Sequence, residues 1–336
     1  MTGSRETYRT VLIGLGDIAE TGHLPALLRH PRFEVVGLCD PDAGRRRRLS
    51  ELAGGRVESF ADVSEVHRRD DIDAVVLALH PEVSVDVAIP FLRKGVAVLD
   101  EKPLAVSPED ARRLGDACRH SIYQIGFAFR YSLFASEVKR HLAEVGDPRA
   151  FVISISDERL SDARPEYLAK LQKILLHSSV INHEGSHFVD LVRYWKGEGF
   201  EFVSAAASAT DSDPMLGGPN IWAASLVGND GAVCQLNIDW LMPELAENRL
   251  RITGLRGVLE VSFSTGRGVL LTNGERREVA FPPFAQNWEE QLNQFARSID
   301  CDSEMGATFF DGLAALLVAG TCEKVVHQAM PIPSPQ

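Results

Sequence analysis

A glycine-rich segment near the N-terminus has the residue types and spacing of a nucleotide-binding turn. Gly14, Gly16 and Ala19 form the pattern G-x-G-x-x-A directly after a short apolar run. In such a turn the first glycine permits a tight bend and the second lets the backbone approach a pyrophosphate. The small third residue allows the following helix to pack on the strand. The pattern also occurs in ordinary strand-to-helix turns, so alone it indicates only a candidate site.

An aspartate at the end of the next apolar run strengthens this interpretation. Asp40 follows the glycines by roughly 20 residues, where a carboxylate can accept hydrogen bonds from both hydroxyls of an adenosine ribose. The same carboxylate would repel a 2′-phosphate, so we expect NAD rather than NADP, although nearby Arg45 could weaken that preference. The alternative is that Asp40 only caps the helix that begins near Pro41.

Up to about residue 126, the sequence around these residues indicates alternating strands and helices, as in βαβ units. Short apolar runs, typical of strands covered on both faces, alternate with longer amphipathic stretches. One helix should begin at Ser107, which supplies an N-cap hydroxyl and is followed by Pro108 at the first helical position. The expected strands are 10–13, 33–39, 72–79, 96–99 and 123–127.

After residue 148 the pattern changes to apolar runs joined by tight turns. Asn229-Asp230-Gly231 and Asn273-Gly274 are hairpin-type turns, so successive strands should be antiparallel neighbours. We expect strands at 151–156, 202–207, 221–227, 233–240, 249–253, 258–263 and 269–272, and helices at 287–299 and 306–328.

The length of the chain favours two domains. A chain of 336 residues is too long for one comfortable core. We therefore expect a doubly wound, parallel α/β Rossmann domain at 1–126. An α+β domain with an open, mainly antiparallel sheet should follow at 127–336, and the C-terminal helices could pack back on the first domain.

Composition excludes several classes of protein. Hydrophobic residues make up 45% and charged residues 24%, which is ordinary for a folded globular chain. A net charge of -12 argues against a nucleic-acid partner. The five cysteines show no C-x-x-C pair or disulfide framework, and the sequence shows neither a secretory signal nor a membrane span. We expect a cytoplasmic protein without a membrane partner.

Three motifs, in order along the chain, match one known family. They are the G-x-G-x-x-A turn, the tripeptide Glu101-Lys102-Pro103, and G-x-H-x-x-D over Gly185, His187 and Asp190. With them the chain resembles the glucose-fructose oxidoreductase / inositol dehydrogenase / rhizopine-catabolism (Gfo/Idh/MocA) family over nearly its whole length. The resemblance implies an NAD-dependent dehydrogenase whose Rossmann half is paired with an open antiparallel sheet. That sheet carries substrate contacts and often an oligomer interface, so we expect a homo-oligomer, a dimer or a tetramer.

The resemblance also assigns the reacting groups. In the family the E-K-P lysine points at the substrate oxygen near the nicotinamide, so Lys102 would stabilise negative charge there. His187 would be the general base, because an imidazole titrates near operating pH; a structural histidine is the alternative. The expected cofactor-binding residues are Gly14, Gly16, Asp17, Ile18, Asp40, Leu79, His80, Glu101 and Lys102.

The sequence departs from the family in two places. His183 stands where family dehydrogenases usually carry an aspartate, so a carboxylate and imidazole pair has become two imidazoles at i and i+4. Leu79-His80-Pro81 replaces a Thr-Pro-Asn loop, and Ser84 stands where a histidine is common. His80 could line the nicotinamide pocket or merely begin a helix.

Two other classes of function compete with this hypothesis. His183-Glu184-Gly185-Ser186-His187 is a literal H-E-x-x-H, the zinc-peptidase helix, but the longer metzincin form would need other residues at Asp190 and Arg193. A non-catalytic dinucleotide-binding regulator of the same fold is the other alternative; Lys102 and His187 argue against it. We expect no metal site.

The reaction we expect is reversible hydride transfer between the nicotinamide and a secondary alcohol carbon of a sugar, amino sugar, nucleotide-linked sugar or cyclitol. The tryptophans among the candidate substrate contacts could equally be core residues. Those contacts are Lys102, Arg130, Tyr131, Asn182, His183, His187, Trp222, Asp239, Trp240 and Asn248.

Overall fold

The computed structural model describes residues 6–157, 165–197, 200–208, 219–240, 248–300 and 306–328. The chain divides into two compact units. The first comprises Met1–Tyr131 and Gln286–Leu313, and the second Ser132–Ala285 and Ala314–Gln336. The sequence suggested a single boundary after residue 126, whereas the first unit is built from two separate stretches of chain.

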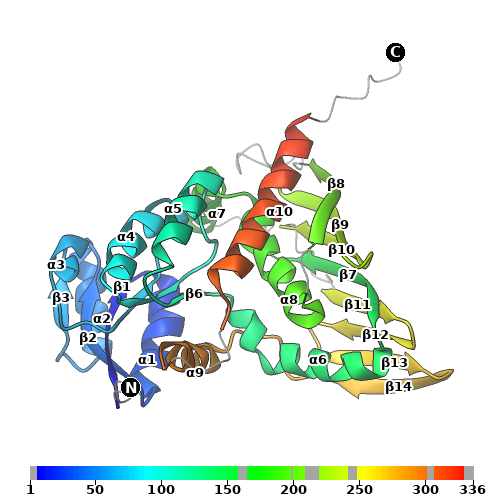
Figure 1. The fold of residues 1–336 in the computed structure, drawn as a ribbon, viewed down its shortest axis with the longest axis horizontal. Coiled ribbons are helices and arrows are strands. Elements are labelled where there is room, and N and C mark those ends of the chain that lie inside the picture. Colours follow the sequence, from blue (N-terminus) through cyan, green and yellow to red (C-terminus); the bar gives the residue numbers. More distant parts are fainter. Residues whose placement is uncertain are drawn as a thin grey trace. The chain divides into compact units, whose positions relative to one another are not determined.

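The first unit contains a six-stranded parallel sheet with strand order β3-β2-β1-β4-β5-β6 (Figure 1). This is the doubly wound Rossmann order, in which the chain changes direction between β1 and β4 and ligands bind beyond the carboxyl ends of those strands. The strands are β1 Tyr8–Ile13, β2 Phe33–Cys39, β3 Glu58–Phe60, β4 Ala74–Leu77, β5 Ala97–Asp100 and β6 Tyr123–Ile125.

Helices cover this sheet on both faces. The face that carries Leu12 and Leu99 packs against Leu27 and, from the C-terminal part of the chain, against Phe295. Ser107 caps α5 through the Asp110 N–H, as the sequence predicts. The helical segments of this unit are η1 Ala19–His23, α1 Leu24–Arg29, α2 Ala43–Leu52, α3 Val63–His67, α4 Pro81–Arg93, α5 Pro108–Ala117, the 3₁₀ turn η2 Ala128–Tyr131 and α9 Trp288–Ile299. A further helix, α10 Phe309–Gln328, begins in the first unit and continues in the second.

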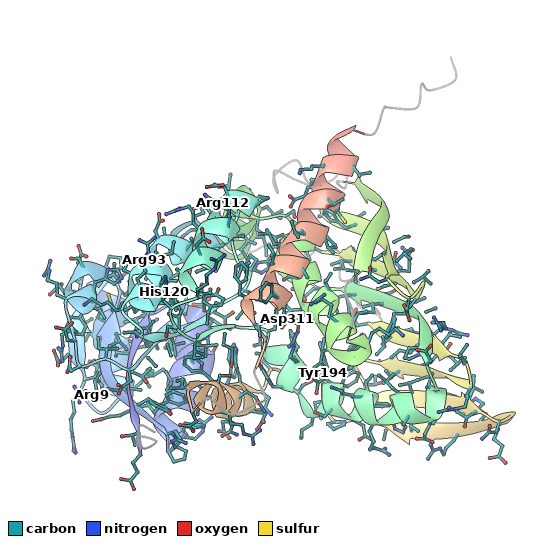
Figure 2. All side chains as sticks on the ribbon, viewed as in Figure 1. Arg9, Arg93, Arg112, His120, Tyr194 and Asp311 are labelled. Atoms are coloured by element: carbon teal, nitrogen blue, oxygen red, sulfur yellow. The ribbon has the colours of Figure 1, made fainter. Side chains whose placement is uncertain are left out.

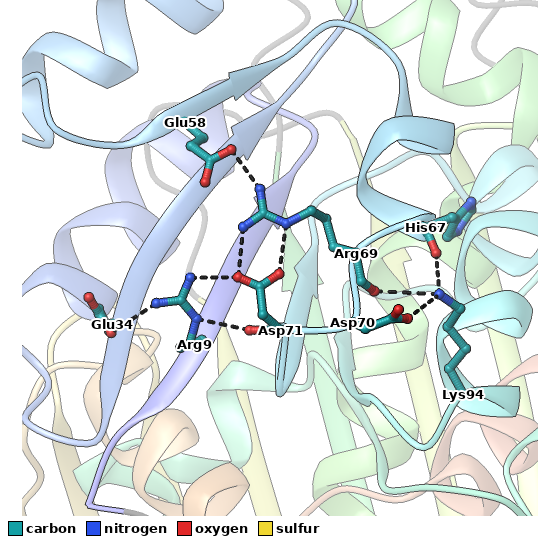
Figure 3. Close-up of polar contacts among 8 residues, drawn as sticks. All are labelled: Arg9, Glu34, Glu58, His67, Arg69, Asp70, Asp71 and Lys94. Carbon is teal, nitrogen blue, oxygen red and sulfur yellow. Dashed lines mark hydrogen bonds and ion pairs between the residues drawn. The ribbon is translucent and has the colours of Figure 1, made fainter.

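A surface ion-pair network ties together the amino ends of the strands (Figure 3). Asp71 accepts from both Arg69 and Arg9, and Arg69 also pairs with Glu58. The Arg69 guanidinium, assisted by Arg9, holds the pKa of Asp71 well below its usual range. Exposed pairs of this kind contribute little stability each. The network lies at the edge of the sheet away from the candidate site, so we give it a structural role only.

The second unit contains an eight-stranded sheet with order β14-β13-β12-β11-β7-β10-β9-β8. Its neighbouring strands are antiparallel except for β7 and β10. The order does not close on itself, so the sheet is open, as expected from the sequence. The strands are β7 Pro148–Ser156, β8 Phe200–Ser208, β9 Ile221–Gly228, β10 Val233–Asp239, β11 Arg249–Gly254, β12 Gly257–Ser262, β13 Arg267–Thr272 and β14 Glu275–Ala280.

The helices of the second unit are α6 Leu133–Val145, α7 Pro165–His177, the π-helical segment η3 Ile181–Gly185 and α8 Ser186–Lys196. Trp195 donates to the Ala135 carbonyl at 3.0 Å, which joins α8 to α6. The Lys139 ammonium lies 4.1 Å from the centre of the Tyr194 ring and makes a second link between the same helices; Figure 2 labels Tyr194. Within the described segments, no helix is both long and apolar enough to cross a bilayer.

Candidate active site

The glycine turn follows β1 and crosses the end of β4. Gly14 has φ +85°, and a Cβ there would lie 2.4 Å from the Ala78 carbonyl oxygen and 2.8 Å from Leu79 Cδ2. No other residue fits this position without moving the neighbouring strand end. A Cβ on Gly16, by contrast, would have nothing within 4 Å. The protein therefore leaves free space beside Gly16, as a turn that admits a pyrophosphate requires.

Asp40 is anchored on this same turn. Its Oδ2 accepts from the Leu15 N–H at 2.8 Å, and its Oδ1 accepts from the Asp42 N–H at 2.8 Å. The side chain is buried. The helix cap that the sequence left as the alternative role of Asp40 belongs to Asp42, which accepts from the Gly44 and Arg45 amides at the start of α2. The cap of α2 is therefore made by Asp42 and not by Asp40.

Two arginines of α2 lie beside Asp40. Arg46 donates to the Asp40 and Pro41 carbonyl oxygens. The Arg45 guanidinium is half-exposed and lies 3.7 Å from Asp40 Oδ2. Arg45 thus puts an exposed positive charge next to the Asp40 carboxylate. A positive charge at this position attracts a 2′-phosphate, whereas the carboxylate repels it.

The end of β5 carries the lysine of the E-K-P motif. Lys102 is partly exposed, and the Lys102–Pro103 peptide is cis. Glu101 is buried and its two oxygens have different partners. Oε1 lies 2.8 Å from His23 Nε2, and Oε2 accepts from the Lys102 N–H at 3.3 Å. His23 was not among the residues predicted from the sequence.

Asp100, the residue before Glu101, is fully buried on the opposite face of the sheet. Its oxygens accept from the Ser84 hydroxyl at 2.5 Å and from the Tyr123 hydroxyl at 3.0 Å. Burial raises the pKa of Asp100 to about 7, although both hydroxyl donors lower it. The carboxyl in turn raises the pKa of Tyr123, whose shift is caused mainly by burial. Ser84, which replaces a histidine common in the family, therefore binds a buried acid.

The other predicted residues of the first unit take varied positions. Leu79 contacts the Gly14 turn as described, Asp17 is exposed at the start of the helix, and Ile18 is partly exposed. His80 is exposed and occupies the N-cap position of α4 without a side-chain cap bond. The sequence left open whether His80 begins a helix or lines the nicotinamide pocket; it does begin the helix.

Arg130 and Tyr131, two expected substrate contacts, have partners inside the first unit. Arg130 pairs with Asp311 at the start of α10, with Nη2 and Oδ1 3.2 Å apart; Figure 2 labels Asp311. The Tyr131 hydroxyl accepts from the Ala307 N–H at 2.7 Å and is almost fully buried. These contacts hold the returning segment against η2.

The two histidines of the second unit lie on different structures rather than on one regular helix. His183 belongs to the π-helical segment η3, is partly exposed, and meets the Trp240 ring edge-on with the centroids 6.0 Å apart. His187 is buried in the first turn of α8. A Cβ on Gly185 would lie 2.8 Å from Ile181 Cδ1 and 3.2 Å from Ile238 Cδ1, so this glycine lets η3 pack directly on β10.

Buried polar atoms accompany His183. Asn182 is 5% exposed, and its Oδ1 has no hydrogen-bond partner among the residues that the structure describes. The same holds for Nε1 of Trp240, which is 1% exposed. Buried polar groups are normally bonded. Asn182 Oδ1 is an acceptor on η3 and Trp240 Nε1 is a donor directly after the end of β10, so the two atoms could bind hydroxyl groups of a ligand.

Three further candidates have structural partners instead. Trp222 donates to the Pro219 carbonyl at 3.0 Å. Asn248 accepts from the Ser156 N–H at 2.7 Å and donates to the Ser156 carbonyl at 3.2 Å. Asp239 accepts from the Ser156 hydroxyl at 2.5 Å. Trp222 and Asn248 thus stabilise the ends of the sheet.

The H-E-x-x-H residues do not form part of a metal-binding cluster in the described parts of the chain. There, no three His, Cys, Asp or Glu side chains are grouped closely enough to hold a metal ion. A catalytic zinc site needs three protein ligands. The zinc-peptidase alternative therefore has no support in the described geometry.

Comparisons with known proteins agree with this fold. Residues 8–127 match the family model described as an oxidoreductase family with an NAD-binding Rossmann fold. An inositol 2-dehydrogenase of Rubrobacter xylanophilus is 25% identical, over 98% of this chain and 94% of its own length. A dTDP-3,4-didehydro-2,6-dideoxy-alpha-D-glucose 3-reductase of Actinomadura kijaniata is 29% identical, over 68% and 67% of the two chains.

A solved structure shares the whole architecture. The myo-inositol dehydrogenase of Corynebacterium glutamicum superposes with a TM-score of 0.78 over 96% of this chain and 97% of its own, at 23% sequence identity. At that identity the likeness concerns the fold. Residues 8–127 thus match the Gfo/Idh/MocA oxidoreductase family, and relatives named inositol 2-dehydrogenase and rhizopine catabolism protein MocA extend the likeness along nearly the whole chain.

Proposed function

We propose that the chain is an NAD-dependent oxidoreductase acting on a secondary hydroxyl, or the corresponding ketone, of a sugar, amino sugar, nucleotide-linked sugar or cyclitol. The observation that carries the proposal is the bond from the Leu15 N–H to Asp40 Oδ2, because it holds the carboxylate that we propose as the ribose acceptor against the glycine turn. The open space beside Gly16 supports it. The substrate class is supported by the relatives named as inositol 2-dehydrogenase and dTDP-sugar reductase.

Lys102 and His187 carry the reaction in this proposal. When bound, the dinucleotide supplies a nicotinamide carbon that accepts or donates the hydride. Lys102 contributes a cation that stabilises negative charge developing on the substrate oxygen. His187 takes or returns the proton of that oxygen, a role worth roughly a hundredfold in rate.

The cofactor preference follows from Asp40. Both Asp40 oxygens accept hydrogen bonds from backbone N–H groups, which hold the carboxylate in one position. In the proposed ribose site, its negative charge would repel a 2′-phosphate. We therefore propose NAD over NADP, with Arg45 as the residue that limits the discrimination.

Asn182, His183 and Trp240 are proposed substrate contacts, because unsatisfied buried atoms of Asn182 and Trp240 flank a partly exposed imidazole. Arg130 and Tyr131 rank below them, since both already have internal partners. We also propose that the protein is a homo-oligomer, a dimer or tetramer, which light scattering on the purified chain would test.

The proposal is tested with a panel of the four substrate classes, each with NAD and NADP, followed by the absorbance of reduced nicotinamide. Turnover of at least one class with NAD is expected. Tight dinucleotide binding without turnover of any class would instead indicate a regulator of the same fold, and absence of dinucleotide binding would refute the proposal. Elemental analysis run alongside should find no stoichiometric zinc.

A further inference from the structure

A buried pair of side chains joins the helix after the glycine turn to the end of β5. His23 is 1% exposed and Glu101 is 8% exposed, and His23 Nε2 lies 2.8 Å from Glu101 Oε1 although the two residues are 78 positions apart. Removing a carboxylate from water is costly, and the cost is recovered only when good hydrogen bonds replace the solvent. The 2.8 Å contact between His23 Nε2 and Glu101 Oε1 is such a hydrogen bond.

Two glycines make room for the pair. A Cβ on Gly126 would lie 2.8 Å from Glu101 Oε1, and one on Gly22 would lie 2.6 Å from Trp288 Cε2. The Trp288 indole in turn packs edge-on against the His23 ring, with the centroids 4.6 Å apart. Side chains at either glycine would displace the carboxylate or the indole that holds the imidazole, so the position of the pair is determined from both sides.

Glu101 also contacts the backbone of the residue that carries the proposed chemistry. While Oε1 faces His23, Oε2 accepts from the Lys102 N–H at 3.3 Å. His23 closes η1, which begins at Ala19, the last residue of the glycine motif. One carboxylate therefore connects the turn proposed to bind pyrophosphate with the strand end that carries the proposed catalytic lysine.

We propose that His23 and Glu101 are a positioning pair, in which His23 holds Glu101 and Glu101 fixes the backbone of Lys102 relative to the glycine turn. The inference rests on the proposed function, because the position of Lys102 affects the rate only if its ammonium meets the reacting oxygen. Neither residue touches the reacting atoms. Displacing a catalytic group by about 1 Å can cost about a hundredfold in rate, so the pair acts on kcat.

The test separates positioning from stability with an apolar replacement of the whole pair. His23→Leu alone leaves a buried carboxylate without its partner and should lower the melting temperature. The double variant His23→Leu/Glu101→Met fills the same space with apolar groups and should recover the melting temperature. We expect its kcat to stay at least tenfold below wild type, with the substrate KM within threefold. The conservative His23→Gln, whose amide can still donate to Glu101, should recover more of kcat than the double variant.

His30 provides the matched control. It is buried in the same unit, at the opposite end of α1, and its Nε2 lies 2.9 Å from Asn293 Oδ1. His30→Leu should reduce stability yet leave kcat within threefold of wild type. A double variant at His23 and Glu101 with wild-type kcat, or a His30→Leu variant that loses kcat equally, would overturn the inference.

Hydrogen exchange keeps this inference distinct from the proposed function. If the wild type turns over no substrate class, the proposed function fails, and the pair is judged by the exchange rate of peptides covering residues 99–106. Faster exchange there in the double variant, at recovered melting temperature and not in His30→Leu, supports the pair as the anchor of the strand end. Unchanged exchange refutes it whatever the activity of the protein.

Discussion

Replacing Asp100 with asparagine should change how the stability of the first unit depends on pH. Asp100 is fully buried, and burial raises the pKa of its carboxyl from 3.8 to about 7. Well below pH 3.8 the carboxyl is protonated in both the folded and unfolded states. As the pH rises, the unfolded state loses its proton first, so the folded state loses relative stability until the pH has passed about 7.

The size of this loss follows from the difference between the pKa values of the folded and unfolded states. A tenfold difference in acidity corresponds to about 1.4 kcal/mol, so the full effect at high pH is about 4 kcal/mol, of which about 3 kcal/mol falls between pH 5 and pH 8. Asparagine resembles the protonated carboxyl. Its oxygen can accept from Ser84, and its amide can donate to the Tyr123 oxygen. Asp100→Asn should therefore remove this part of the pH dependence.

Urea unfolding at pH 5, 6, 7 and 8 provides the measurement. Hydrogen-exchange mass spectrometry of peptides from β4 and β5 reports the first unit separately from the second. Relative to wild type, Asp100→Asn should gain about 3 kcal/mol of unfolding free energy between pH 5 and pH 8. Glu51→Gln, a change at an exposed helical carboxylate, should not. Parallel pH curves for wild type and Asp100→Asn would show that the carboxyl titrates normally and that our account of its burial is wrong.

The remaining predictions concern the proposed chemistry. NAD should bind at least several-fold tighter than NADP, and Asp40→Ser should reduce that ratio, as measured by dinucleotide titration; tighter binding of NADP to the wild type would contradict the role of Asp40. Lys102→Ala should lower kcat by well over tenfold while dinucleotide binding survives, and a smaller loss with the true substrate would exclude Lys102 as the catalytic cation. His187→Ala should lower kcat about a hundredfold with partial recovery at high pH, whereas His183→Ala should mainly raise KM. A fully active His187→Ala with an inactive His183→Ala would reverse the two assignments.

The parts of the fold that could be predicted are those that local sequence patterns determine. The buried strands of the parallel sheet consist mainly of apolar residues, and Asn273-Gly274 forms its hairpin with φ 54° and 79°, so both were found from the sequence. β3 was missed because it is three residues long, and β14 because it is a charged edge strand with most residues exposed. The residues of β14 contain no alternation of apolar and polar side chains that would reveal a strand.

The parts of the site that could not be predicted depend on contacts between distant residues. His23 and Glu101 are 78 positions apart, and no spacing rule indicates that a buried histidine will meet the motif glutamate. The π-helical segments are likewise invisible to a 3.6-residue periodicity, which is why His183 and His187 were expected on one helical face. The sequence suggested that the C-terminal helices could pack back on the first domain, and α9 does so, but the contact of Phe295 with Phe33 that holds it there is again long-range.

Three consecutive residues at the end of β5 acquire three different electrostatic environments because side chains alternate along a strand. Asp100 points to the face covered by α4, where burial raises its pKa and keeps its carboxyl largely protonated below pH 7. Glu101 points to the opposite face and meets His23. Lys102 leaves the strand and is partly exposed. Below pH 7, therefore, the proposed catalytic cation follows one carboxylate with a fixed partner, Glu101, and one acid that is mostly neutral, Asp100. A neutral Asp100 adds no negative charge to this strand end, so the charge that precedes Lys102 depends on pH through the buried acid.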